Sequence, residues 1–413
     1  MIAVEAFVVE MWNESPVMRA TLTSGEVVLF SLRDGREFRE LERANLHSAG
    51  EQFGNNAGFS LDRTDSFDVE NIYMDQWTVE SNFNSHRPML LFSASDGTEW
   101  YISSRTGEVV QLTYSVERFG NWIGSVVHWL YPTFLRKHTL LWSQLVIWLT
   151  IIALFLTLTG LVIGIKQFGV RKGASQASSA NSPYQGWNLW HHYIGLASGA
   201  FLLMWLFSGL VSMNPWGALE GRSFNAERER FIGPSVALSS AFRFIANLGA
   251  VPAATVRIES NIVDGAIQAV ALTADDQATR FSAAGELDPV SLEEAAQHAK
   301  RIKPDGLIAG MDTLDVGDEY YYEHHDDKPF PVHRVTFRDG ERFYFSQSRG
   351  RMELAIDVSR KWYRWLFRAM HTGDFHPVAR ARPLWDGWML VVLFCLSAGS
   401  LTGVYLAYRR LRQ

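Results

Sequence analysis

The stretch VVHWLYPTFLRKHTLLWSQLVIWLTIIALFLTLTGLVIGI, residues 126–165, contains the feature that decides the fold. No charged residue interrupts it from Leu140 to Ile165. A run of about 20 apolar residues is long enough to cross a lipid bilayer. Trp142 stands near the start of the run, and amphipathic aromatic rings favour the membrane interface. The stretch therefore predicts a transmembrane helix with a histidine, His128, just outside it.

Two further segments, at about 193–213 and 387–408, also lack charged residues and are long enough to span a membrane. Trp190, Trp216 and Trp385 lie near their ends, as expected for interfacial side chains. Three such segments favour a multi-pass membrane protein over buried helices of a soluble domain.

The composition is that of a chain only partly in lipid, because hydrophobic residues make up 47% of its 413 residues. The formal net charge is −6 and there is no basic run, so we expect contact with membrane lipid and no nucleic-acid partner. The single cysteine, Cys395, lies in an apolar segment. It excludes a disulfide framework and a thiol-based metal site.

Basic residues follow the first span at Lys166, Arg171 and Lys172, and follow the third span at 409–412. Cytoplasmic loops of membrane proteins carry an excess of positive charge. We therefore expect both large regions outside the spans to lie on the outer face, in the periplasm of a bacterium.

An internal repeat relates the two halves of the chain. Adding 243 to a residue number gives a gapless correspondence that ends inside the spans. The matches include Asp75 with Asp318, Pro88 with Pro331, Tyr101 with Tyr344, Trp122 with Trp365, His128 with His371, and Trp142 with Trp385. The counterpart of the span at 193–213 would precede Met1, so the repeat predicts a fourth, N-terminal helix.

The regions outside the spans read as small α+β modules. PVHRVTF and ERFYFSQ flank Asp339-Gly340, which is typical of a two-stranded hairpin with a tight turn. The first half repeats this pattern around Asp96-Gly97. Ser291 followed by Glu294 is a capping box that opens a helix. The predicted fold class is thus an α+β membrane protein built from a repeat of transmembrane helices and outward-facing α+β domains.

The boundaries that we expect are 1–115 for the first periplasmic domain, 116–138 for an interfacial His-bearing helical segment, 139–166 for a transmembrane helix, 167–190 for a cytoplasmic loop, 191–213 for a transmembrane helix, 214–355 for the second periplasmic domain, 356–385 for a second His-bearing segment, 386–408 for a transmembrane helix and 409–413 for a cytoplasmic tail.

Three stretches carry a resemblance to a known family: YISSRTGEVV (101–110), WHHYIGLASGAFLLMWLFSGLVSMNPWG (190–217) and RPLWDGWMLVVLFCLSAGSLTGV (382–404). The first resembles the PepSY domain. Together they look like the PepSY-associated transmembrane family over essentially the whole chain, although that family usually has four spans. Some of its members are similar to inner-membrane ferric siderophore reductases, which hold b-type haem between their helices.

The resemblance directs attention to the histidines, because haem iron in a helical bundle takes imidazole nitrogens as axial ligands. His128 and His371 occupy matching places in the repeat, and we expect them to ligate haem iron. The alternative is that each ring anchors an interfacial helix. His191 and His192 open the second span and are also candidate ligands, with His192 slightly favoured. His376 is a reserve ligand for the metal.

The implied function is that of an inner-membrane, b-type cytochrome-like protein with one or two haem b groups. Electrons would come from a quinol or a cytoplasmic reductant and pass to a periplasmic acceptor. A ferric siderophore is the acceptor we expect, which would make the protein a haem-dependent ferric siderophore reductase. The alternatives are binding or regulation of a periplasmic peptidase or envelope peptide by the PepSY-like domains, or an accessory role in siderophore uptake, without redox activity.

Overall fold

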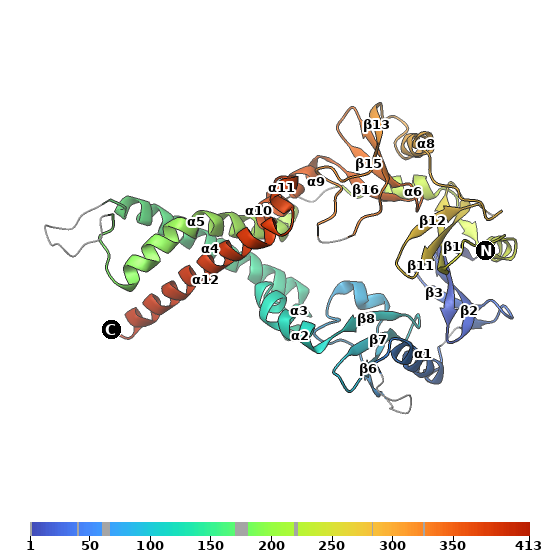
Figure 1. Ribbon diagram of the computed structural model, residues 1–413, viewed down its shortest axis with the longest axis horizontal. Coiled ribbons are helices and arrows are strands. Elements are labelled where there is room, and N and C mark those ends of the chain that lie inside the picture. Colours follow the sequence, from blue (N-terminus) through green and yellow to red (C-terminus); the bar gives the residue numbers. More distant parts are fainter. Residues whose placement is uncertain are drawn as a thin grey trace. The chain divides into compact units, whose positions relative to one another are not determined.

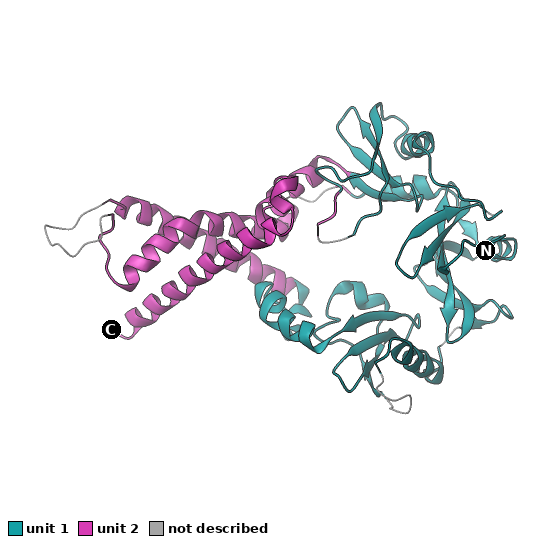
Figure 2. Cartoon of the chain, viewed as in Figure 1, with its two compact units in different colours: residues 1–139, 223–321, 327–355 teal, residues 140–222, 322–326, 356–413 magenta. Residues whose placement is uncertain are grey.

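The computed structural model describes residues 2–38, 41–59, 67–169, 181–218, 222–282, 284–324 and 327–413. The chain forms two compact units (Figure 2). Unit 1 comprises residues 1–139, 223–321 and 327–355, and unit 2 comprises residues 140–222, 322–326 and 356–413. Arg171 and Lys172, which contributed to the predicted orientation, lie outside the described residues.

An eight-stranded antiparallel sheet draws its strands from both halves of the sequence (Figure 1). Its order is β12-β11-β10-β1-β2-β3-β4, with β9 added beside β1. The strands are β1 (Ala3–Trp12), β2 (Ser15–Leu22), β3 (Val27–Ser31), β4 (Glu37–Phe38), β9 (Val236–Ala237), β10 (Thr255–Val263), β11 (Ala266–Thr273) and β12 (Ala278–Phe281). The central pair is β1 with β10, in a register that places Glu10 opposite Arg257.

Two-residue turns set the register of both central hairpins. Asn13 and Glu14 have φ of 49° and 60° between β1 and β2, and Asp264 and Gly265 have φ of 55° and 72° between β10 and β11. Positive φ at both turn residues matches the right-handed twist of the flanking strands.

Each half of the chain also supplies a four-stranded antiparallel sheet with one helix packed on it. The first sheet contains β5 (Asp68–Ile72), β6 (Met89–Ser93), β7 (Glu99–Ser103) and β8 (Val109–Thr113), with α1 (Arg43–Asn56). The second contains β13 (Ile308–Leu314), β14 (Val332–Phe337), β15 (Arg342–Ser346) and β16 (Met352–Ile356), with α8 (Leu292–Ile302). Strands β14, β15 and β16 each begin 243 residues after β6, β7 and β8.

Local sequence signals explain these modules. Asp96-Gly97 and Asp339-Gly340 form the turns of the two predicted hairpins, with both glycines at positive φ. Ser291 caps α8 as predicted, since its hydroxyl accepts a hydrogen bond of 3.1 Å from the backbone N–H of Glu294. On α1, Gly50 lets Phe92 approach the helix backbone, where a methyl group would lie 2.2 Å from the ring.

The large sheet and the small sheets share cores. Trp12, Val17 and Leu29 of the large sheet pack with Leu46 of α1 and with strands β6 and β7. Helix α7 (Leu238–Ala246) covers another part of the large sheet. The remaining helical elements of unit 1 are η1 (Ser81–Ser85), α2 (Ser115–Asn121), η2 (Trp122–Val126), α3 (Thr133–Arg136) and α6 (Asn225–Ile232). The sequence boundaries treat 1–115 and 214–355 as two domains, whereas β1 and β10 pair in one sheet.

Among its described residues, unit 2 has three helices long and apolar enough to cross a membrane, as predicted: α4 (Thr139–Gln167), α5 (Trp187–Ser212) and α12 (Leu384–Leu411). Helix α5 begins at Trp187, directly after Gly186 at positive φ, so His191 and His192 lie one turn inside it. The shorter elements of unit 2 are η3 (Pro215–Gly217), α9 (Val358–Tyr363), η4 (Arg364–Ala369), α10 (Met370–Thr372) and α11 (Pro377–Arg380).

The ion pair that fastens α8 to the large sheet predicts an acid-sensitive step in stability. His298, 3.4 Å away, and Arg280 lower the pKa of Glu294 to about 2. A depressed carboxyl pKa contributes stability above the usual value of 4.5, and the contribution is lost as the pH falls from there towards 2. Replacing Glu294 by Gln should lower the unfolding free energy by about 1.5 kcal/mol at pH 6.

The difference in unfolding free energy between wild type and E294Q should shrink as the pH falls to about 3. The measurement is the thermal unfolding of the full-length protein followed by circular dichroism. E293Q is the matched control, because Glu293 is the exposed neighbour on the same helix. A gap between wild type and E294Q that stays constant with pH would contradict this account.

Candidate functional site

A cavity of about 750 Å³ lies among the three long helices of unit 2. Its volume falls in the range of cofactor and small-molecule sites, roughly 300–1,000 Å³. Glycines from all three helices line it: Gly160 and Gly164 of α4, Gly195 and Gly199 of α5, and Gly399 and Gly403 of α12. At Gly160 and Gly195 an added methyl group would meet open space, so helix backbone faces the cavity there. At Gly164, Gly199 and Gly399 it would meet a leucine or isoleucine side chain of a neighbouring helix, so these glycines allow close helix packing.

His192 lines this cavity but is occupied by structural hydrogen bonds. Its Nε2 lies 2.8 Å from the carbonyl oxygen of Gly164, and its Nδ1 lies 2.8 Å from the hydroxyl of Ser182. A carbonyl only accepts, so Nε2 carries the proton and Nδ1 accepts from Ser182. The ring is 7% exposed. His192 therefore ties α5 to α4 and has no nitrogen left for a metal.

His191 presents the opposite chemistry at the same cavity. Its Nδ1 lies 3.0 Å from Thr402 Oγ1, and that hydroxyl already donates its proton to the carbonyl of Gly399 at 2.8 Å. Thr402 must then accept, so Nδ1 carries the imidazole proton and Nε2 keeps its lone pair. Nε2 has no hydrogen-bond partner within the described part of the chain. The structure thus favours His191 over His192 as a ligand.

Gly403 provides the room that this arrangement needs. A methyl group at that position would lie 3.2 Å from Cε1 of His191, which is tighter than ordinary van der Waals contact. The His191 ring therefore rests against the α12 backbone. An imidazole whose Nδ1–H is held by a hydrogen bond is fixed in tautomer and in ring orientation.

His371, on α10 (Met370–Thr372), contacts a serine of α5 through the same ring nitrogen. Its Nδ1 lies 3.0 Å from Ser208 Oγ, and Ser208 donates to the carbonyl of Trp205 at 3.1 Å. The buried serine must accept, so Nδ1 carries the proton. The ring also packs on Phe367, with centroids 5.3 Å apart. His191 and His371 are thus both held through Nδ1 by a hydroxyl that is itself fixed to helix backbone.

The two histidines define separate positions along the bundle. His191 and Ser208 are both on α5 and are 17 residues apart, which corresponds to about 25 Å of helix. One metal centre cannot bind both. Unit 2 therefore contains two candidate ligands for two different centres.

The predicted partner of His371, His128, belongs to unit 1 and is exposed. A five-residue π-helix, η2, ends two residues before His128, and the π-helix η4 ends two residues before His371. π-Helical turns are rare and are frequently found at functional sites. That the two rings ligate one haem stays a prediction. His376, by contrast, caps α11, since its Nδ1 accepts from the N–H of Val378 at 3.2 Å.

A buried ionic cluster follows His371 and was not predicted from the sequence. The Asp374 side chain is 1% exposed and pairs with Arg364 at 3.4 Å and Arg380 at 3.2 Å. Both guanidinium groups also lie against the ring of Tyr322. Burial, together with a hydrogen bond to Asp374, raises the pKa of Tyr322. The cluster fixes the chain just after the histidine.

The internal repeat does not mark this cluster. His128 and His371 recur 243 residues apart, whereas the first-half counterparts of Asp374 and Arg364 are Tyr131 and Asn121. Only the fold shows that Tyr322, Arg364 and Asp374 meet.

Comparison with known proteins identifies the family. The family model described as PepSY-associated TM region matches residues 40–410. The chain belongs to this family. Family membership and the three apolar helices together establish that this PepSY-associated protein is a membrane protein. No curated protein and no solved structure matches the chain.

The different roles of the adjacent histidines can be separated by stability. Replacing His192 by Ala removes the link between α5 and α4 and should lower the unfolding free energy by about 1–3 kcal/mol. Replacing the exposed His191 by Ala should lower the unfolding free energy by less than the His192 replacement does. The measurement is the thermal unfolding of both variants in the same detergent, and equal losses in the two would contradict the assignment.

Proposed function

We propose that this protein is a haem-dependent electron-transfer protein of the bacterial inner membrane that reduces an acceptor in the periplasm. The observation that supports this proposal most strongly is the cavity in unit 2. It combines apolar side chains and open backbone at Gly160 and Gly195 with the imidazole of His191, whose Nε2 has no hydrogen-bond partner among the described residues.

The residues present fit a haem group. Haem would need an apolar space and an axial nitrogen. In support of the proposal, the cavity has apolar side chains, open backbone at Gly160 and Gly195, and the ring of His191. Bound haem would supply one-electron chemistry between ferric and ferrous iron. The chain's own contribution is to hold and orient the ring of His191 through Thr402, and to surround the group with leucine side chains that exclude water.

His371 provides a second position, so the proposal includes two haem b groups. His191 lies near the end of α5 that joins the basic loop, which the positive-inside rule assigns to the cytoplasm. Electrons from a quinol or cytoplasmic reductant would enter there. His371, about 25 Å further along α5, would serve the periplasmic end, with His128 as its proposed second ligand.

The proposed acceptor is a ferric siderophore. Ferric iron is a hard cation that hard oxygen ligands bind tightly, and one electron converts it to ferrous iron, which they hold less tightly. Reduction at the outer face would therefore release the metal from its carrier. Large domains on that face would be in position to meet such a complex.

The test is the absorption spectrum of the purified full-length protein from haem-replete cells, before and after dithionite reduction. We expect reduced b-type bands, the loss of about half of the haem in H191A and in H371A, and the loss of all of it in the double variant. H376A is the control, because His376 caps a helix, and it should keep the full spectrum.

A conservative variant tests the hydrogen bond to His191. T402V should keep haem but shift the midpoint potential of one centre, because Nδ1 of His191 loses its acceptor. A colourless wild-type protein would sink the proposal. It would leave the alternative that the outward-facing domains bind or regulate a peptidase or envelope peptide without redox activity.

A further inference from the structure

A stripe of exposed apolar side chains runs along α2 and η2, the helical segment that precedes α3 and α4 (Figure 1). Val116, Phe119, Ile123 and Val127 form this apolar stripe, at spacings that place them on one face of a helix. Their exposed fractions are 80%, 69%, 65% and 62%. Glu117 is the one exposed charged residue in the range 115–127, all of which the structure describes.

The other side of this segment is bound to the first small sheet. Arg118 donates a hydrogen bond of 2.7 Å to the carbonyl oxygen of Gly97, in the turn between β6 and β7. The ring of Trp122 meets that of Trp77 edge to face, with centroids 6.5 Å apart. Val126 is buried. The apolar stripe is therefore the face that the described fold leaves uncovered.

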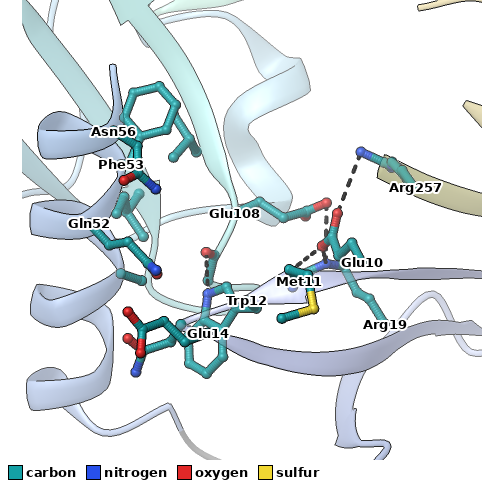
Figure 3. Close-up of a pocket in the computed structure, with 15 residues that line it drawn as sticks. Glu10, Met11, Trp12, Glu14, Arg19, Gln52, Phe53, Asn56, Glu108 and Arg257 are labelled. Carbon is teal, nitrogen blue, oxygen red and sulfur yellow. Dashed lines mark hydrogen bonds and ion pairs between the residues drawn. The ribbon is translucent and has the colours of Figure 1, made fainter. Parts of the chain in front are cut away.

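The strand before the segment is itself held to the large sheet, and α2 begins two residues after β8 ends at Thr113. Just ahead of β8, the carbonyl oxygen of Gly107 accepts a hydrogen bond of 2.9 Å from Nε1 of Trp12. The next residue, Glu108, pairs with Arg19 of β2 at 3.3 Å (Figure 3). The apolar stripe thus stands on a folded support.

The matching segment of the second half has a different neighbour. A shift of 243 residues takes the starts of α2 and η2 to those of α9 and η4. Both η4 and α10 pack against α5, and His371 of α10 lies 3.0 Å from the hydroxyl of Ser208 on that helix. Ile123 of the stripe corresponds to Leu366, which is half-buried. The same element therefore contacts a long helix in one half and presents an exposed apolar face in the other.

The chain keeps the segment near the bilayer. Helix α3 ends at Arg136, and the apolar helix α4 begins at Thr139. Phe134 of α3 is 72% exposed and lies six residues before Leu140, so at most about 20 Å of extended chain separates the two. Arg136 and Lys137 follow, and such side chains extend their charged ends to the head groups while their stems stay in apolar surroundings.

These observations select lipid as the partner of the stripe. A contiguous exposed apolar patch marks a contact with protein or with a membrane. The chain belongs to a membrane family, and the patch continues into a helix that is apolar enough to span the bilayer. A helix that lies in the interface buries its apolar face about 5–10 Å into the boundary between head groups and acyl chains.

We propose that the apolar stripe inserts into the leaflet in which α4 begins and anchors the first small sheet to the membrane. The two halves of the repeat then use one element for two contacts, with lipid in the first half and with α5 in the second. This inference is independent of the proposed haem function, so the two can fail separately.

The test uses full-length protein in phospholipid nanodiscs, in a background where the native cysteine is replaced (C395S). F119C and I123C place single cysteines in the stripe. N121C is the matched control, because Asn121 is exposed and lies between them on another side of the same helix. Each cysteine carries the fluorophore NBD. Iodide in the buffer reports contact with water, and nitroxide-labelled lipids report contact with the bilayer.

We expect nitroxide lipids to quench NBD at positions 119 and 123, and iodide to quench it there several-fold more weakly than at position 121. A nitroxide near the top of the acyl chain should quench more strongly than one near its end, because an interfacial helix reaches only about 5–10 Å into the boundary. Each variant is compared with itself in unlabelled lipid, so that bound haem affects both measurements equally.

Three outcomes would overturn the proposal. Iodide that quenches all three positions equally would show that the stripe lies in water. Stripe positions that are shielded from iodide but not quenched by nitroxide lipids would show that protein covers them, either another helix or a second copy of the chain. Equal quenching by lipid at positions 119, 121 and 123 would show that no single face inserts.

Discussion

The antiparallel pairing of β1 with β10 is the interaction on which the whole of unit 1 depends. It joins two meanders, far apart in sequence, into one sheet, and each meander carries its own small sheet and helix. The register also places Arg257 opposite Glu10, so the ion pair between these two residues exists only when the halves are paired.

Unit 2 obeys a different constraint, because helices are the only single segments that satisfy their backbone groups inside a bilayer. Side-chain hydroxyls are then the main means of fixing a polar ring between helices. The hydroxyls of Thr402 and Ser208 each donate a hydrogen bond to a helix carbonyl and accept one from Nδ1 of a histidine. Both ring nitrogens of His192 make hydrogen bonds within the protein, to Ser182 and to the carbonyl of Gly164. Three histidines of the same type thus acquire two roles through their neighbours.

Much of the fold could be predicted because its signals are local. Uncharged runs of about 20 residues mark α4, α5 and α12, Asp-Gly pairs mark the hairpins, and Ser291 marks the start of α8. The sequence slightly favours His192 over His191 as a ligand, but it cannot separate the two residues further because they are adjacent on one turn of α5. Their difference comes from Gly164 and Thr402, which lie 28 and 211 residues away along the chain.

The sequence by itself determined the membrane class, the number of apolar helices, the family and the histidines worth testing. Each of these features depends on composition, periodicity or a short motif, and such signals can be read from residues that are close together in the sequence. Only the tertiary structure decided that Nδ1 of His191 meets Thr402, that Asp374 is paired with Arg364 and Arg380, and that Arg19 is paired with Glu10 and Glu108. The reason is physical, because a proton position or an ion pair depends on which distant atoms come within about 3 Å.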